Sequence, residues 1–266
     1  MCCAFVMTVP RGLKAFLKES SPGKLTRGKY KGYRAIDSHG AFEGPTLKGI
    51  TKRLSAKLYS VGELDETATT STQWTPGCWQ GNNGGLRRGK AVDSQVSRLA
   101  SASESARKAA SKYKFTSITF SALSKAGLTP LLGQRVALSR QHGIATAADM
   151  LCWHSASKSV VVVELKCGFS GNRTAPAVVK NRPQKMRAPC AGASDCLLHR
   201  HMAQLATTYE LLRRETRLLA TLKAKFGAEI KGALLYVNDR DSQLHELSDW
   251  WVRRGKALVA LLGTRD

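Results

Sequence analysis

The chain has 266 residues, of which 42% are hydrophobic and 23% are charged, a composition that suits one folded domain with additional segments. The sequence holds no apolar run approaching the roughly 20 residues that span a membrane, so a membrane partner is not expected. Lys and Arg number 42 against 19 Asp and Glu, which gives a formal net charge of +23. This charge predicts an acidic polymer as partner, with nucleic acid preferred over an anionic membrane surface.

The first 60 residues are basic and rich in Gly, Ser and Lys, and their first acidic residue is Glu19. An acid-poor, basic start fits a mitochondrial transit peptide, and it also fits a mobile nucleic-acid-binding arm, which we prefer. We therefore expect residues 1–84 to be a basic arm with a turn-rich lead-in, and residues 85–266 to be the main folded domain. Seven cysteines without a disulfide-rich spacing indicate reduced thiols in an intracellular protein, with the nucleus preferred and the mitochondrion as the alternative.

Residues 86–113 are predicted to be a helix, because apolar residues recur along them at helical spacing. Asp93 lies beside that apolar stripe and shortly after Arg88. Residues 115–143 are expected to be a mixed connector, in which Pro130 opens a turn of helix and residues 135–140 form a half-exposed strand.

The centre of the sequence is predicted to be a pair of strands, residues 144–153 and 158–167, joined by a short polar turn. The second strand contains four consecutive valines, Val160 to Val163, and such a run indicates a sheet covered on both faces. Glu164 and Lys166 are two positions apart, so their side chains leave the same face of the strand. The turn should place Asp149 opposite Val163 or Glu164.

Asp149, Glu164 and Lys166 are thus predicted to meet beside a hydrophobic sheet. Burial of two carboxylates is costly unless a cation compensates their charge. Two carboxylates and the backbone carbonyl of Leu165 suit Mg²⁺ or Mn²⁺, which prefer oxygen ligands. A lysine beside such a metal can position a water or help to deprotonate it, which is the equipment for phosphodiester hydrolysis. The alternative is a surface salt bridge on an exposed strand.

The segment after this strand, residues 168–197, is basic and contains three prolines. Its basic residues are expected to clamp phosphates, and the alternative is an insertion without fixed structure. They are Lys180, Arg182, Lys185 and Arg187. Residues 198–226 are predicted to be one long helix ended by Gly227, followed by two strands within residues 232–247 and a last helix over 249–262.

At Asp149 followed by Glu164-Leu165-Lys166, the chain resembles the PD-(D/E)XK nuclease superfamily, with Ala148 in place of the usual preceding proline. The resemblance covers roughly residues 85–247. It implies an α/β fold of the restriction-endonuclease-like type, with a mixed central β-sheet flanked by helices. It also implies a Mg²⁺-dependent (or Mn²⁺-dependent) deoxyribonuclease.

The two flanking helices are similar to those of RecB-like and lambda-type exonucleases. Gln204-Leu205 followed by Tyr209 resembles their glutamine–tyrosine helix, although the tyrosine lies five residues after the glutamine rather than four. The resemblance implies that Asp149, Glu164, the Leu165 carbonyl and Asp93 bind metal. The alternative for Asp93 is a solvent-exposed residue near a helix start, where the helix dipole favours a carboxylate. It further implies that Lys166 and Gln204 act in catalysis and that Arg88 and Tyr209 contact nucleic acid.

The expected function is therefore exonuclease-like hydrolysis of DNA in recombination, repair or replication, with DNA as partner and an oligomer compatible with the sequence. The alternative is a non-catalytic DNA- or RNA-binding protein that retains a nuclease-like fold. The sequence leaves open DNA against RNA, and exonuclease against endonuclease.

Overall fold

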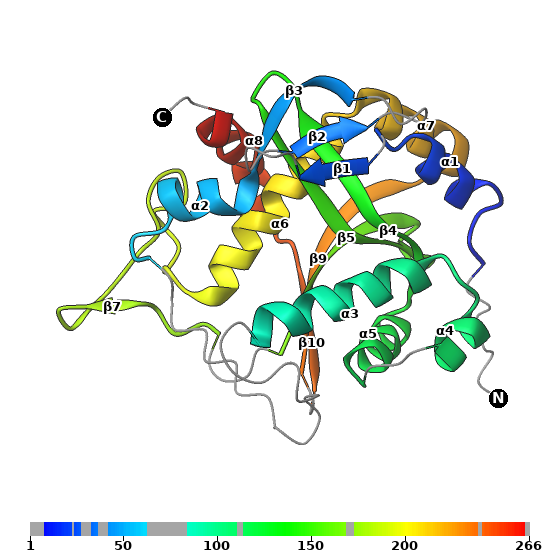
Figure 1. The fold of residues 1–266 in the computed structure, drawn as a ribbon, viewed down its shortest axis with the longest axis horizontal. Helices are drawn as coiled ribbons and strands as arrows, with labels where there is room; N and C mark the ends of the chain where they lie inside the picture. Colours follow the sequence, from blue (N-terminus) through cyan, green and yellow to red (C-terminus); the bar gives the residue numbers. More distant parts are fainter. Residues whose placement is uncertain are drawn as a thin grey trace.

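A mixed β-sheet runs through the molecule, with helices packed on both faces (Figure 1). The computed structural model describes residues 8–22, 24–27, 33–36, 42–62, 84–110, 114–168, 173–238 and 241–263. The strands follow the order β1-β2-β3-β5-β6-β9-β10, with β4 beside β5. The β3–β5 and β6–β9 pairs are parallel and the remaining pairs are antiparallel. The expected α/β class with a mixed, helix-flanked sheet is confirmed.

The strands of this sheet are β1 (Lys24–Arg27), β2 (Tyr33–Ile36), β3 (Phe42–Gly49), β4 (Leu128–Ser139), β5 (Ile144–His154), β6 (Ser159–Cys167), β9 (Glu229–Val237) and β10 (Ser242–Glu246). The helices are α1 (Leu13–Glu19), α2 (Ile50–Leu58), α3 (Gly84–Ala100), α4 (Glu104–Ala110), α5 (Lys114–Lys125), α6 (Leu197–Arg213), α7 (Thr216–Phe226) and α8 (Asp249–Gly263). In the described chain, no helix is both long and apolar enough to cross a membrane.

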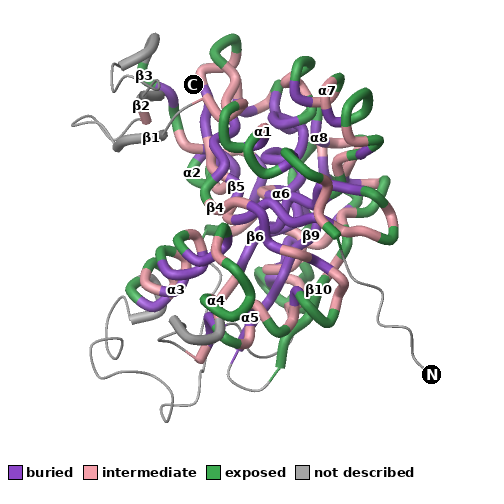
Figure 2. Tube along the Cα trace, turned by 90° about the vertical axis from the view of Figure 1, so that its right-hand side faces the viewer, coloured by how far each residue is buried: buried purple, intermediate pink, exposed green. Residues whose placement is uncertain are grey.

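Two hydrophobic cores cover the two faces of the sheet, and the valine run of β6 serves both. Val160 and Val162 pack with α1, α2, α6, α7 and α8, whereas Val161 and Val163 pack with α3 and α5. Figure 2 shows buried residues along β6, β9 and α6. The prediction of a strand covered on both faces is confirmed, since the apolar side chains leave the strand alternately to either side.

The connector predicted over residues 115–143 is wrong in detail, because it contains helix α5 and the whole of strand β4. Pro130 lies inside β4 and opens no helix. In the described sheet β4 pairs with β5 and no other strand, and their register shifts between Pro130 and Leu132. A proline without an N–H is tolerated at such an edge irregularity.

The two long helices predicted from the sequence are each broken in two. The first ends at Ala100, and α4 then starts where the Ser103 hydroxyl accepts a hydrogen bond from the Ala106 N–H at 3.2 Å. The second is interrupted at Glu215, whose carboxylate lies 2.7 Å from the fully buried Arg135 guanidinium. A buried arginine needs such a partner, and this contact holds Glu215 between α6 and α7.

The described parts of the predicted basic arm belong to the same body as the rest of the chain. Strands β1 to β3 extend the central sheet, and β3 pairs with β5 at Lys48–Ile144 and Gly49–Ala145. Helices α1 and α2 bury Leu13, Leu17, Ile50, Leu54 and Leu58 in the larger core. The division at residue 84 itself stays a prediction.

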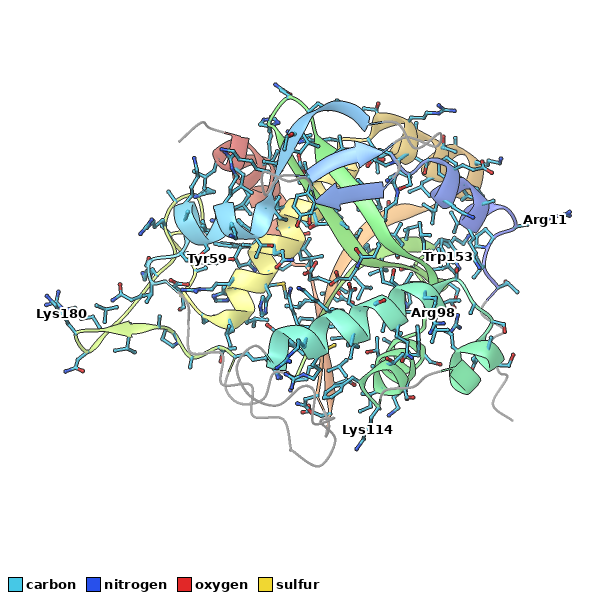
Figure 3. All side chains as sticks on the ribbon, viewed as in Figure 1. Arg11, Tyr59, Arg98, Lys114, Trp153 and Lys180 are labelled. Carbon is cyan, nitrogen blue, oxygen red and sulfur yellow. The ribbon has the colours of Figure 1, made fainter. Side chains whose placement is uncertain are left out.

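The basic segment after β6 forms a hairpin of β7 (Val178–Val179) and β8 (Arg182–Pro183), which projects from the body in Figure 1. Its turn residues Lys180 and Asn181 have positive φ values of 48° and 61°. Figure 3 shows Lys180 at the far end of this projection. The base of the hairpin is held by the Ala177 N–H, which donates to the Asp195 carbonyl at 2.8 Å.

Candidate active site

The candidate site lies where β5 changes partners along one of its edges. Residues 150–154 of β5 pair with β6, and residues 144–145 pair with β3. Between these two pairings lie residues 146–149, while β4 follows the other edge of β5 over its whole length. A cavity of about 470 Å³ opens at this position, and Thr146, Ala147 and Asp149 line it. The sheet therefore contains a gap that exposes backbone and side chains of its central strand.

A local break in side-chain alternation turns Asp149 toward this gap. In a regular strand, residues two apart share a face. Here Met150 belongs to the core beside α3, yet Ala148 belongs to the opposite core. The neighbouring strand β4 has a matching break in alternation. Gly133 lies against α3, whereas Arg135, two residues later, faces Glu215 on the other side of the sheet. The residue between them, Gln134, has a positive φ of 52°.

Asp149 and Glu164 meet at the point where β5 and β6 separate. The last residue pair of these strands is Met150–Val163, so the next positions are Asp149 and Glu164, as predicted. The Leu165 N–H donates to Asp149 Oδ2 at 2.8 Å. Because the N–H and C=O of one strand residue point to the same side, the Leu165 carbonyl also faces Asp149.

Lys166 and Gln204 complete the cluster around Glu164, which is only 2% exposed. Lys166 Nζ donates to Glu164 Oε1 at 2.7 Å and to Gln204 Oε1 at 3.2 Å. Gln204 Nε2 donates to the same Glu164 oxygen at 2.5 Å. The structure thus brings together four predicted residues from β5, β6 and α6.

Asp93 approaches this cluster from α3. The helix lies so close to β4 that a Cβ on Gly133 would stand 2.5 Å from Ser97 Cα. Gln134 Nε2 donates to both Asp93 carboxylate oxygens, at 2.9 and 3.0 Å. Burial raises the pKa of Asp93, the Gln134 amide opposes that shift, and the charge of Glu164 adds to it.

The carboxylates are electrostatically strained as a group. Burial raises the pKa of Asp149 well above its ordinary value, the charge of Glu164 raises it further, and Lys166 opposes both effects. Asp93 contributes a smaller increase. Carboxylates that repel one another at a buried site hold either a proton or a cation.

The donor chemistry of this group fits a hard divalent cation. Glu164 Oε2 and Asp149 Oδ1 accept no hydrogen bond from any described residue, whereas the other oxygen of each carboxylate is occupied. Among the described residues, no three His, Cys, Asp or Glu side chains are already gathered as a metal-binding group. Glu164, Asp149 and the Leu165 carbonyl still supply oxygen donors of the kind that Mg²⁺ and Mn²⁺ prefer.

The residues predicted to contact nucleic acid lie at separate places in the structure rather than together at the cluster. Arg88 belongs to α3, and its guanidinium fills the space beside Gly168, which follows the end of β6 and has a φ of +84°. Tyr209 is not brought to the cluster, because it is 8% exposed and its hydroxyl donates to the Ile230 carbonyl at 3.3 Å. The four basic residues of residues 180–187 are exposed on and beside the hairpin.

One wall of the cavity was not predicted from the sequence. It is formed by the end of β3 and the start of α2, including Lys48, Gly49 and Arg53. The available signal was Gly49 directly before an amphipathic segment, since glycine is one of the residues that precede helices. This region lies within residues 1–84, which were predicted to be a basic arm with a turn-rich lead-in.

Comparison with known proteins finds no matching family model, no matching curated protein and no matching solved structure. The assignment of a function therefore depends on the residues and geometry of the site.

Proposed function

We propose that this protein is a metal-dependent nuclease that hydrolyses DNA phosphodiester bonds on a restriction-endonuclease-like fold. The observation that carries the proposal is the cluster of Asp149, Lys166 and Gln204 around the buried Glu164, next to a cavity that Asp149 lines. A net charge of +23 supports a polyanionic substrate. The order α3, β4, β5, β6, α6, β9 also agrees with the α, βββ, α, β order that the resemblance implies, with α4, α5, the β7–β8 hairpin and α7 as additions between these elements.

In this proposal Asp149, Glu164 and the Leu165 carbonyl hold Mg²⁺ or Mn²⁺, and Asp93 is a further candidate ligand. The bound metal would polarise the scissile phosphate and lower the pKa of a water. The ammonium of Lys166 would orient the attacking water and offset negative charge that develops on the phosphate. Gln204 would fix the position of Lys166 and Glu164 through its amide, because it bonds to both.

Within this class we infer an exonuclease-like enzyme of DNA recombination, repair or replication. The α6 helix with Gln204 and the α3 helix with Asp93 support this choice, as both resemble the flanking helices of RecB-like and lambda-type exonucleases. The competing proposal is a non-catalytic DNA- or RNA-binding protein on the same fold. The nuclease proposal requires DNA cleavage that depends on Mg²⁺ and Lys166, whereas the competing proposal requires binding without cleavage.

The test is digestion of end-labelled linear and closed circular double-stranded DNA in Mg²⁺, with EDTA as a control. We expect Mg²⁺-dependent cleavage that falls roughly 10²–10³-fold in Lys166→Ala, the loss typical of removing one charge-stabilising group. Sparing of the circular DNA would identify an exonuclease. Tight DNA binding without cleavage in Mg²⁺ or Mn²⁺ would leave only the non-catalytic protein.

A matched variant separates catalysis from folding. Lys166→Ala removes the cation next to the buried Glu164, and the loss of such a partner also destabilises a protein. Lys231→Ala, an exposed lysine of the adjacent strand β9, should retain full activity. Melting temperatures of both variants establish that cleavage is compared between folded proteins.

A further inference from the structure

The cavity beside the carboxylates has a second wall with a different chemistry. Asp93, Gln134 and Asp149 line one side, and the start of α2 from Ile50 to Arg53 lines the other together with the end of β3. The two walls come from segments that are far apart in the sequence and meet through the short β3–β5 pairing. A single ligand in this cavity would touch both.

Helix α2 presents an uncapped N-terminus to the cavity. The helix has nine residues, its N-cap is Gly49, and no side chain caps its first amides. Its first turn contains no acidic residue. The first amides of a helix lack partners within the helix and carry partial positive charge, so they favour an anion.

Arg53 is a second, independent feature of this wall that favours an anion. Its side chain lines the cavity and is 9% exposed, yet it forms no hydrogen bond or ion pair with any described residue. Its Nε atom is fully buried without a partner. Two other buried arginines are paired with a carboxylate, Arg135 with Glu215 at 2.7 Å and Arg200 with Asp195 at 2.6 Å. Arg135 Nε also lacks a partner, so the absence of any carboxylate partner is what distinguishes Arg53.

A buried, unpaired guanidinium lowers the stability of the fold. Such a cost is characteristic of a binding group whose partner arrives with a ligand. A phosphate group matches both features on this wall, because its oxygens accept from helix amides and form paired hydrogen bonds with a guanidinium.

We propose that Arg53 and the N-terminus of α2 bind a phosphate group of the nucleic acid strand next to the bond that is cleaved. The identification of the strand as nucleic acid rests on the proposed function, whereas the anion site rests on the cavity alone. The phosphate is either a terminal monoester or an internal diester, since both present the same acceptor oxygens. The cavity then holds a substrate phosphate on one wall and the carboxylates of Asp93 and Asp149 on the other.

The test measures binding in EDTA, so that cleavage does not contribute. Three forms of one labelled oligonucleotide are compared: with a 5′-phosphate, with a 3′-phosphate and with neither. Arg53→Met should weaken binding about tenfold or more, the scale of one lost charge-assisted hydrogen-bond pair. If the loss is confined to a terminally phosphorylated form, the site holds a terminal phosphate, and an equal loss for all three assigns it to an internal phosphate.

Melting temperatures distinguish an arginine that binds a ligand from one with a purely structural role. Arg53→Met removes an unpaired buried charge, so its melting temperature without ligand should be equal to or above that of the wild type. Inorganic phosphate should raise the melting temperature of the wild type and not that of the variant. A variant that melts lower and binds all three oligonucleotides normally would overturn the proposal.

Two further variants keep the result interpretable. Arg53→Lys retains the charge and loses the planar pair of donors, so it should bind with intermediate affinity. Lys57→Met, at the other end of the same helix, should bind like the wild type. Loss of binding in Arg53→Met by a protein that never cleaves DNA would support the anion site and refute the nuclease. Normal binding by Arg53→Met in an active nuclease would refute only the anion site.

Discussion

At the scale of single residues, Asp149 is a carboxylate whose ionised form lowers the stability of the fold. Its folded-state pKa is raised by burial and by neighbouring carboxylates, so the ionised form destabilises the fold. The stability that protonated Asp149 contributes is fully present below the ordinary aspartate pKa of 3.8. It is lost as the pH rises through the raised pKa of Asp149 in the folded state.

Asp149→Asn should therefore be more stable than the wild type at neutral pH in EDTA. We expect a melting temperature higher by roughly 2–4 °C, which corresponds to about 1 kcal/mol in a protein of this size. The advantage should vanish below about pH 4, and added Mg²⁺ should stabilise the wild type alone. Calorimetric or fluorescence melts from pH 3 to 8 measure this, and a variant less stable than the wild type at neutral pH would contradict it.

The residues of the carboxylate cluster were accessible from the sequence, because strand alternation and turn length fix which side chains can meet. Asp149 falls opposite Glu164 once the polar turn is placed, and Glu164 and Lys166 must share a face. Arg53 was not accessible in this way. Its significance is the absence of a partner in a buried position, and only the packing of α2 against the sheet reveals that.

At the scale of elements, the β7–β8 hairpin carries two kinds of exposed side chain. Val178 and Val179 are 61% and 42% exposed, and Lys180 and Arg182 stand beside them at the turn. At the base of the hairpin, the buried Asp195–Arg200 ion pair connects the segment to the start of α6. The hairpin is therefore a basic projection on a firm base, suited to contact a phosphate backbone outside the cavity.

Reversal of charge at Lys180 and Arg182, both to Glu, should weaken DNA binding and reduce its salt dependence. Each lost phosphate contact lowers the slope of log K against log salt by about one, so a change of about two is expected. The control reverses Arg217 and Lys223, which are exposed on α7, and should alter binding less. Fluorescence anisotropy over a salt series measures both, and equal effects of the two double variants would argue against a hairpin contact.

The helices and strands whose bounds could be predicted from the sequence are those determined by the pattern of neighbouring residues. The valine run of β6, the strand before it and the final helix were predicted close to their observed bounds. The helix break at Glu215 was not, because its cause is Arg135 some 80 positions away in the chain. The three N-terminal strands were missed for the same reason, since they exist as parts of a sheet whose other strands lie far along the sequence.

At the scale of the whole molecule, a net charge of +23 should make nucleic-acid binding strong at low salt and steeply salt-dependent. For about six to ten contacted phosphates, the affinity for duplex DNA should fall roughly 10³–10⁵-fold between 50 and 200 mM salt. Filter binding at several salt concentrations tests this, with EDTA present so that cleavage does not contribute. A flat dependence would show that net charge contributes little to recognition.

The two walls of the cavity belong to different stretches of the polypeptide. Asp93 and Asp149 belong to α3 and β5, while Gly49 and Arg53 belong to a segment that joins the sheet through two residue pairs. If the proposed function holds, the residues for cleavage and the residues for phosphate binding lie in separate stretches of the chain. Exchange of the β3–α2 segment should then change which kind of end or strand is bound and leave the residues proposed for cleavage in place.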